Sequence, residues 1–328
     1  MTDRRTTHHG KEIFEPSPFI PPIIDDFITE KSITVLCADA GQGKTSLAVC
    51  AALAVATGSP FLNKLTVQRP VLYINEEMAP ENFKDWRLLP TLKGMDLGED
   101  AVENIHWLSK PGYDFFNDDD IQEVIDKLLE VKAGFLVTDT LSSIMGNRNL
   151  SEAMDIALLF SRLEDIVEET NTAILLNHHE NRGGSYLGSA LLKAKTDNLW
   201  LMTADKHKVK NGEYSNLTIH LDKVRLGVER IEYGKITYVT DDHRNPITIV
   251  LSPDRKDSKI GSLTGSKRSD YDFILRAGRV TLAEIAANDR SVTHDTHKTI
   301  VARLIKDGLV KNLSARKPPA IYAVTSDE

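Results

Sequence analysis

The sequence predicts an α/β protein in which helices cover both faces of a mainly parallel sheet. From about residue 23 to residue 251, short apolar runs alternate with helical patterns, as expected of parallel strands that are buried on both sides. A glycine-rich turn joins the first of these strands to its helix. A stretch rich in Gly, Ser and charged residues then precedes a compact C-terminal segment, which indicates a second, smaller domain.

Strands and helices follow one another in a regular order along the first region. Apolar runs predict strands at Ser32–Cys37, Val71–Asn75, Phe135–Thr138, Ala173–Asn177 and Asn198–Met202. Helical patterns lie between them at Lys44–Thr57, Ile121–Val131 and Ser151–Thr170. Later runs, separated by glycines or by Asn-Pro, predict antiparallel strands that extend the sheet at Leu217–Leu221, Glu229–Tyr238 and Ile247–Leu251.

The composition is that of a globular protein with two domains. The chain has 328 residues, and a domain typically contains about 100–200. We expect an N-terminal arm over residues 1–21, a core domain over 22–252, a linker over 253–268 and a C-terminal domain over 269–328. Hydrophobic residues make up 41% and charged residues 27% of the chain, which excludes collagen-like, disordered and membrane-spanning classes.

Charge and cysteine usage indicate the setting in which the protein works. The net charge is −8, yet residues 253–328 hold 14 Lys and Arg against 10 Asp and Glu. This basic tail is either an ordinary solvated surface or the contact region for an anionic partner.

Cys37 and Cys50 are too few for a disulfide framework or a zinc site, so we expect buried thiols. With no secretory signal or membrane span in the sequence, we expect a cytoplasmic location.

The turn after the first strand has the sequence of a phosphate-binding loop. Residues 38–45 read Ala-Asp-Ala-Gly-Gln-Gly-Lys-Thr, with Ala in the first Gly position of the motif. The glycines let backbone N–H groups surround phosphate oxygens, and the helix N-terminus adds partial positive charge. Lys44 would reach the β- and γ-phosphates of ATP, and the Thr45 hydroxyl would bind Mg²⁺. The expected nucleotide-binding residues are Ala38, Asp39, Ala40, Gly41, Gln42, Gly43, Lys44, Thr45 and Ser46.

Two carboxylates complete the predicted ATP site. Asp139 directly follows an apolar strand and would hold Mg²⁺, either directly or through water. Glu76 and Glu77 follow another strand, at the end of the parallel sheet where nucleotides bind. We favour Glu77 as the base that activates the attacking water, and expect Glu76 to be a solvated charge.

Three features resemble the RecA-like branch of phosphate-loop ATPases, especially the ring helicases of the plasmid RepA and bacterial DnaB type. Glu77, in Tyr-Ile-Asn-Glu-Glu-Met, resembles the catalytic glutamate of that branch. Residues 174–180, Ile-Leu-Leu-Asn-His-His-Glu, resemble its strand-end sensor, in which His178 or His179 would detect the γ-phosphate; we place His178 in the nucleotide site. Lys223 and Arg225, in Lys-Val-Arg-Leu-Gly, resemble the segment that enters a neighbouring subunit's ATP site.

The resemblance implies an oligomer that acts on DNA. Residues 22–251 would form a RecA-like core, and a homo-oligomer, a hexameric ring, would hydrolyse ATP at its subunit interfaces. Loops after Asp139 and after the sensor would line a channel for single-stranded DNA, where Arg148 and Arg182 would contact phosphates. One departure is that residues 186–190 read Tyr-Leu-Gly-Ser-Ala, where RepA-type helicases carry Arg-Gly-Ser-Ser. Arg225 would have to replace that arginine, or the match is to another branch.

The C-terminal segment resembles winged helix-turn-helix domains over about 60 residues. Its patterns predict helices at Asp270–Ala277, Thr281–Ala286 and His294–Asp307, then a strand, a basic wing and a second strand. Thr281 and Glu284 have the spacing of a capping box. Such a domain binds double-stranded DNA, binds only proteins, or holds subunits together, and we favour DNA because the local charge is positive and the wing is basic. The residues expected to contact DNA are His297, Lys298, Arg316 and Lys317.

Together these features predict a DNA-dependent ATPase that uses ATP and Mg²⁺ and has no membrane partner. The leading interpretation is a replicative helicase of a plasmid, phage or other mobile element. One alternative is a DNA-binding regulator or helicase loader that hydrolyses ATP without unwinding DNA. A second alternative is a filament-forming recombination ATPase, which would assemble open helices in place of closed rings.

Overall fold

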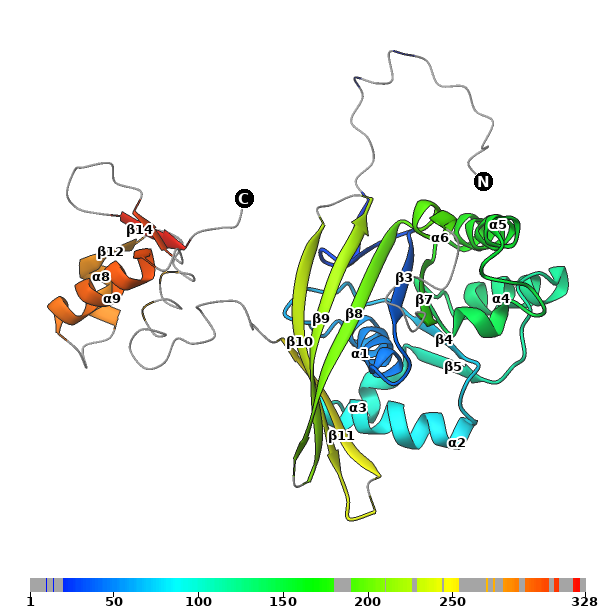
Figure 1. The fold of residues 1–328 in the computed structure, drawn as a ribbon, viewed down its shortest axis with the longest axis horizontal. Coiled ribbons are helices and arrows are strands. Elements are labelled where there is room, and N and C mark those ends of the chain that lie inside the picture. The colour runs from blue at the N-terminus through cyan, green and yellow to red at the C-terminus, as the bar shows by residue number, and fades with distance from the viewer. Residues whose placement is uncertain are drawn as a thin grey trace. The chain divides into compact units, whose positions relative to one another are not determined.

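The computed structural model divides the chain into two units, Met1–Asp254 and Arg255–Glu328 (Figure 1). The structure describes residues 20–179, 190–209, 211–225, 229–243, 245–253, 280–288, 293–306, 310–312 and 321–324, and the single residues 10, 14, 270 and 274. Most of the predicted arm and of the predicted linker therefore lie outside the described residues. Each unit has a hydrophobic core of its own.

The described part of the first unit is built on a sheet of nine strands in the order β11-β10-β9-β8-β3-β7-β6-β4-β5. The parallel strands are β3 (Ile33–Ala38), β4 (Val71–Asn75), β5 (Ile105–Ser109), β6 (Phe135–Asp139), β7 (Ala173–His179) and β8 (Asn198–Val209). Strand β7 lies between β3, which leads into the glycine-rich turn, and β6, which ends at Asp139. The predicted α/β fold with a mainly parallel sheet is confirmed.

Four strands extend this sheet beyond β3, of which β8 is parallel to β3 and antiparallel to the strand that follows it (Figure 1). They are β8, β9 (Gly212–Val224), β10 (Arg230–Thr240) and β11 (Pro246–Pro253). Strand β8 continues to Val209, well past the predicted end at Met202, because its exposed polar half pairs with β9 along its whole length. The long extension leaves the plane of the parallel strands. Residues of β8 to β11 and residues of the phosphate-binding loop line the same cavity.

Helices cover both faces of the parallel strands and create two separate cores. Helix α1 (Lys44–Thr57), rich in Ala and Val, is buried along almost its entire length between the parallel strands and the antiparallel extension. Helices α4 (Asp118–Glu130) and α5 (Ala153–Thr170) pack on the opposite face. Alternate residues of β3 enter the two cores, with Leu36 on the α1 side and Val35 on the other, as a strand buried on both faces requires.

The segment between β4 and β5 is helical, which the sequence analysis did not predict. It comprises α2 (Pro80–Phe83), a π-helical turn η2 (Lys84–Leu88) and α3 (Leu89–Gly94). Helix α3 packs directly on β11, and a Cβ atom on Gly94 would approach the backbone oxygen of Ile249 to 1.9 Å. Only glycine fits at this contact, which holds the helical segment against the antiparallel extension.

Short elements connect the main ones in the first unit. They are β1 (Pro22–Ile24), β2 (Ile28–Thr29), the 3₁₀ turns η3 (Glu99–Val102) and η4 (Leu141–Ile144), and α6 (Ala190–Lys195).

Cys37 and Cys50 are buried free thiols, as predicted, and burial raises the pKa of Cys50 to about 12. Among the described residues, no helix is both long and apolar enough to cross a membrane.

The second unit contains two helices and a small antiparallel sheet among its described residues. These are β12 (Val280–Thr281), α8 (Leu282–Asn288), α9 (His294–Lys306), β13 (Val310–Asn312) and β14 (Ile321–Val324), with the sheet order β12-β14-β13. The predicted capping box is confirmed, since the Thr281 backbone N–H donates to Glu284 Oε2 at 2.7 Å. The element order is the one expected of a winged helix, but the predicted wing and most of the first helix lie outside the described residues.

Candidate active site

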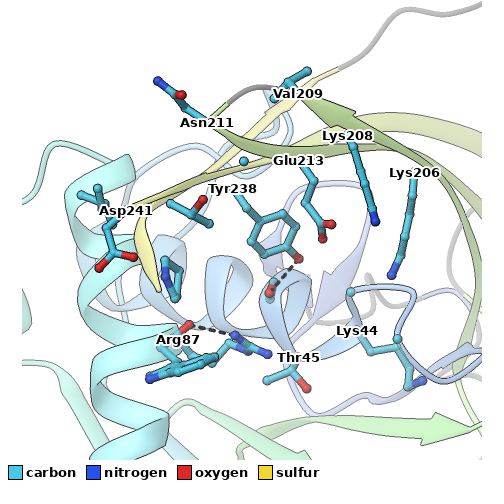
Figure 2. Close-up of a pocket in the computed structure, with 18 of the residues that line it drawn as sticks. Lys44, Thr45, Arg87, Lys206, Lys208, Val209, Asn211, Glu213, Tyr238 and Asp241 are labelled. Carbon is cyan, nitrogen blue, oxygen red and sulfur yellow. Dashed lines mark hydrogen bonds between the residues drawn. The ribbon is translucent and has the colours of Figure 1, made fainter. Parts of the chain in front are cut away.

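A cavity of about 980 Å³ lies at the phosphate-binding loop, where the carboxyl ends of β3, β6 and β7 meet the antiparallel extension (Figure 2). One wall carries Lys44, Thr45, Glu77, Asp139 and His179. The facing wall comes from η2 and from β8–β11. The cavity therefore has the polar residues predicted to act on ATP on one side and a second wall from the same chain on the other.

The glycine-rich turn has the conformation that phosphate binding requires. Gly41 and Gly43 have φ values of 73° and 96°, a region that side-chain-bearing residues rarely adopt, and Gly43 is the N-cap of α1. The Lys44 ammonium donates to the carbonyls of Ala38 at 2.7 Å and Asp39 at 2.9 Å, and burial lowers the pKa of Lys44. The turn and the helix N-terminus thus direct N–H groups and one lysine into the cavity.

Asp139 lies fully within the core at the floor of the cavity. The Tyr73 hydroxyl donates to its Oδ2 at 3.0 Å, while Oδ1 is buried with no hydrogen-bond partner among the described residues. Burial raises the pKa of Asp139, and the polar side chains of Asn177 and Thr45 partly oppose this rise. An unsatisfied buried carboxylate oxygen beside the Thr45 hydroxyl fits an Mg²⁺ ion, which prefers oxygen ligands.

Glu77 and His179 face each other across the mouth of the cavity. His179 Nε2 lies 3.2 Å from Glu77 Oε1, and its Nδ1 lies 3.1 Å from the Lys44 ammonium. An ammonium can only donate, so Nδ1 accepts from Lys44 and Nε2–H donates to Glu77. Glu76 points elsewhere and accepts from the backbone N–H groups of Gly112 and Tyr113. The structure therefore places Glu77, and not Glu76, at the cavity.

His178 is the histidine predicted to face the nucleotide, but the structure places His179 at the cavity. In the parallel pairing, His179 lies beside Ala38 on the α1 side of the sheet, while His178 lies beside Cys37 on the other side. His178 is 1% exposed and does not line the cavity. Side chains alternate along a strand, so only one of two adjacent histidines can face the phosphate-binding loop.

The second wall of the cavity consists of residues that sequence reasoning did not find. Lys206 and Lys208 on β8 and Glu213 on β9 point down toward the loop (Figure 2). Tyr238 on β10 donates from its hydroxyl to Ser46 Oγ at 3.0 Å, and burial raises the pKa of Tyr238. Arg87, Trp86 and Ile247 also line the cavity. The sequence offers only a short alternation, Met-Thr-Ala-Asp over residues 202–205, which extends the strand a little past Met202.

Lys223 and Arg225 lie near the end of β9 and do not line this cavity. The Lys223 ammonium donates to the carbonyls of Lys193, Ala194 and Thr196 at 2.6–2.8 Å, so it caps the end of α6. Burial is the main cause of the lowered pKa of Lys223. The Arg225 side chain is 56% exposed and pairs with Asp197 at 2.9 Å. Of the two basic residues, Arg225 is the more accessible to another chain.

The residues predicted to bind DNA differ in their exposure and in their contacts. Arg148 is 51% exposed, but it pairs with Asp155 at 3.6 Å and lies over the Phe116 ring. Lys298 is exposed on α9. For His297 the prediction is wrong, because its side chain is fully buried and its Nδ1 hydrogen-bonds to Asp270 at 2.8 Å. The predicted contacts Arg182, Arg316 and Lys317 lie outside the described residues.

The strand order and the phosphate-binding loop together define a RecA-like P-loop ATPase. Residues 5–185, more than half of the chain, match the AAA domain family, and the protein belongs to this family. No curated protein matches the chain. Among solved structures it is similar to a KaiC-like protein of the hyperthermophilic archaeon Pyrococcus horikoshii OT3, with 14% sequence identity and a TM-score of 0.47. That match covers 70% of this chain and 94% of the archaeal one.

Proposed function

We propose that this protein hydrolyses ATP with Mg²⁺ at the described cavity and that DNA controls the reaction. The observation that carries the proposal is the gathering of Lys44, Thr45, Glu77, Asp139 and His179, from four separate segments, around one cavity. The loop and Lys44 bind the phosphates, and Thr45 and Asp139 hold the metal. Bound Mg²⁺ would neutralise charge on the transferred phosphoryl group.

Glu77 is the base for the attacking water in this proposal. Its carboxylate is accessible at the cavity mouth and accepts from His179 Nε2–H. A carboxylate at this place can orient the water and accept its proton as the bond to the γ-phosphorus forms. His179 also accepts from Lys44. The three side chains therefore form one chain of contacts, which runs from Lys44, the cation that would bind phosphate, to Glu77, the base. A γ-phosphate that engages Lys44 would be sensed by His179 and hence at Glu77.

We propose that the active assembly is a ring, in which Arg225, with Lys223 nearby, approaches the ATP of a neighbouring chain. Arg225 supports this role because its side chain is more than half exposed and lies away from the cavity of its own chain. A cation supplied across an interface stabilises charge that develops on the γ-phosphate and makes hydrolysis depend on assembly. The hexameric subunit number is part of the same proposal.

The leading biological role in this proposal is a replicative helicase of a plasmid, phage or other mobile element, acting on single-stranded DNA. The decisive experiment measures ATP turnover with and without single-stranded DNA, together with the mass of the particle and unwinding of a forked duplex. A helicase would show DNA-stimulated turnover, a closed oligomer and strand displacement. Lys44→Ala should remove turnover and displacement together, and unchanged turnover in this variant would reject the site.

A second function, a DNA-bound ATPase regulator or helicase loader, is supported by the state of Arg148. This candidate channel residue is engaged by Asp155 and by the Phe116 ring within its own chain. A side chain held in this way is less available to phosphates of a translocating strand. Turnover that responds to DNA without strand displacement would identify the regulator.

A further inference from the structure

The antiparallel extension brings lysines from the same chain over the phosphate-binding loop. Lys206 and Lys208 occupy alternate positions of β8, on the face that also carries Met202 and Ala204, and both point toward the loop in Figure 2. A Cβ atom placed on Gly41 would lie 3.7 Å from Lys206 Nζ. The Lys206 ammonium is therefore adjacent to the turn whose N–H groups would surround phosphate oxygens.

Lys206 brings a positive charge to the cavity. Within the described part of the chain, no carboxylate pairs with its ammonium and the ammonium has no hydrogen-bond partner, while the residue opposite it on β9 is the uncharged Ser215. Lys208 differs, because the residue opposite it is Glu213, which also lines the cavity. An unpaired cation that faces a cavity favours an anionic ligand there. Lys206 is thus the better placed of the two lysines to contact phosphate.

Two hydrogen bonds fix the extension over the loop. The Ala204 backbone N–H, two residues before Lys206, donates to the Gln42 side-chain oxygen at 2.7 Å. The Tyr238 hydroxyl donates to Ser46 Oγ at 3.0 Å. Both acceptors belong to the loop or to the first turn of α1, so the strand that carries Lys206 is tied to the phosphate site itself. The lysine backbone is positioned before a ligand arrives, which lowers the entropic cost of the contact.

We propose that Lys206 is a phosphate-binding residue that acts in cis, contacting the terminal phosphates of a nucleotide held by the loop of its own chain. The inference rests on the proposed function and deepens it by adding a second cation beside Lys44. The two cations approach from opposite walls, Lys44 from α1 and Lys206 from β8. Tight binding of nucleoside triphosphate then needs no neighbouring subunit. The neighbour's Arg225 would act on the hydrolysis step.

The first test measures the affinity of full-length protein for a fluorescent, non-hydrolysable ATP analogue with Mg²⁺, at concentrations where mass measurement shows single chains. Lys206→Ala should weaken binding by about 10- to 100-fold, the range for a lost charge-assisted contact, and Lys206→Arg should retain most of the affinity. Lys235→Ala is the matched control, because Lys235 lies on β10 of the same extension, over the Tyr214 ring, and is not among the residues that line the cavity. Its affinity should equal that of the wild type.

The outcomes separate this inference from the proposed function. Wild-type protein that binds no nucleotide would reject the proposed function itself. Wild-type binding with an unchanged Lys206→Ala variant, or equal losses in Lys206→Ala and Lys235→Ala, would overturn only the role of Lys206. A second test mixes Lys206→Ala with Lys44→Ala protein. A residue that acts in cis cannot be supplied by the other chain, so binding should stay weak, and restored binding would contradict the inference.

Discussion

Lys44, His179 and Glu77 form a continuous chain of contacts, and this chain gives each residue a separable role. His179 contacts both Lys44 and Glu77. In the proposed function, Lys44 would hold phosphate, His179 would report its position and Glu77 would act on water. Asp139 lies at the floor of the cavity, where one of its buried carboxylate oxygens has no hydrogen-bond partner among the described residues. Because binding and chemistry depend on different side chains, single substitutions should affect them separately.

Glu77→Gln should preserve nucleotide binding and slow hydrolysis. The amide keeps the size of the side chain but cannot accept a proton, so we expect turnover to fall by about 10²- to 10⁴-fold. Rates of phosphate release and the affinity for a fluorescent ATP analogue would be compared with those of the wild type. Glu76→Gln is the matched control, since Glu76 accepts from backbone N–H groups outside the reaction. Equal losses in both variants would show that Glu77 is not the base.

Asp139→Asn should stabilise the protein and inactivate it. Burial raises the pKa of Asp139, so at neutral pH the folded protein bears the cost of a buried charge that the amide lacks. Without nucleotide and Mg²⁺, we expect the free energy of unfolding to rise by about 1 kcal/mol. At acidic pH the Asp139 carboxyl is protonated in both the folded and the unfolded protein, so the wild type buries no charge. The wild type loses stability as pH rises through the folded pKa of Asp139, so the gain from the substitution should appear at neutral pH and vanish at acidic pH. Urea titrations at several pH values measure this, and a gain independent of pH would contradict it.

The second wall of the cavity depends on how three elements pack together. The helical segment Pro80–Gly94 carries Trp86 and Arg87, and its last helix α3 rests on β11 through Gly94. Strands β8 and β10 are tied to the loop by Gln42 and Ser46. A change far from the phosphates can therefore alter the nucleotide site through the position of this wall.

Gly94→Ala should destabilise the first unit and weaken nucleotide binding. The added Cβ would lie 1.9 Å from the Ile249 oxygen, a backbone atom that cannot move without shifting β11. We expect a loss of about 1–3 kcal/mol in the free energy of unfolding, as for overpacked contacts. Gly98→Ala is the control, since no atom lies within 4 Å of its added Cβ. Urea denaturation and analogue binding measure both effects, and similar behaviour of the two variants would refute the packing argument.

At the scale of the whole molecule, the chain divides into two compact units, and the proposed assembly joins many copies of the first. Each unit has its own core, with Ile274, Ile285 and Leu304 among the buried residues of the second. The described residues that line the cavity belong to the first unit. The proposed ATP hydrolysis and the proposed DNA binding can therefore be tested separately.

Mixing two inactive variants should restore hydrolysis if Arg225 acts across an interface. An Arg225→Ala chain keeps its own Lys44, and a Lys44→Ala chain supplies an intact Arg225, so mixed oligomers contain complete sites. An arginine supplied in trans contributes about 10³- to 10⁵-fold to the rate, so the recovery should be easily seen in phosphate release. Each variant alone at the same total concentration is the control. Mixtures as inactive as their components would place Arg225 outside the reaction.

Removing residues 255–328 should leave the ATP site intact. The described residues that line the cavity belong to the first unit, so basal turnover and analogue affinity should match those of the full chain. If the second unit binds duplex DNA through Lys298, the truncated protein should lose retention on a duplex in a gel-shift assay. Full-length Lys298→Ala protein is the complementary measurement. A truncated chain that no longer binds nucleotide would show that the units depend on each other.

Most of the parallel sheet and half of the site could be predicted from the sequence, because strong local signals encode them. The strand Val71–Asn75 and the helix Lys44–Thr57 have the predicted ends, since an unbroken apolar run and a glycine-rich turn define them. The choice between His178 and His179 depends on register with β3, which alternation alone does not reveal. The helical segment with Trp86 and Arg87 was missed because two prolines interrupt its pattern. Lys206 depends on a long-range approach of β8 to the loop, which no local pattern records.

Helix α1 is enclosed by sheet on one side and by the antiparallel extension on the other, with nearly every residue buried. A helix buried in this way cannot shift without disturbing the layers packed on both of its sides, so its N-terminus would be a fixed support for the triphosphate of the proposed function. The end of β7, where His179 contacts Lys44, would then be the part of the described sheet through which occupation of the site by phosphate is felt.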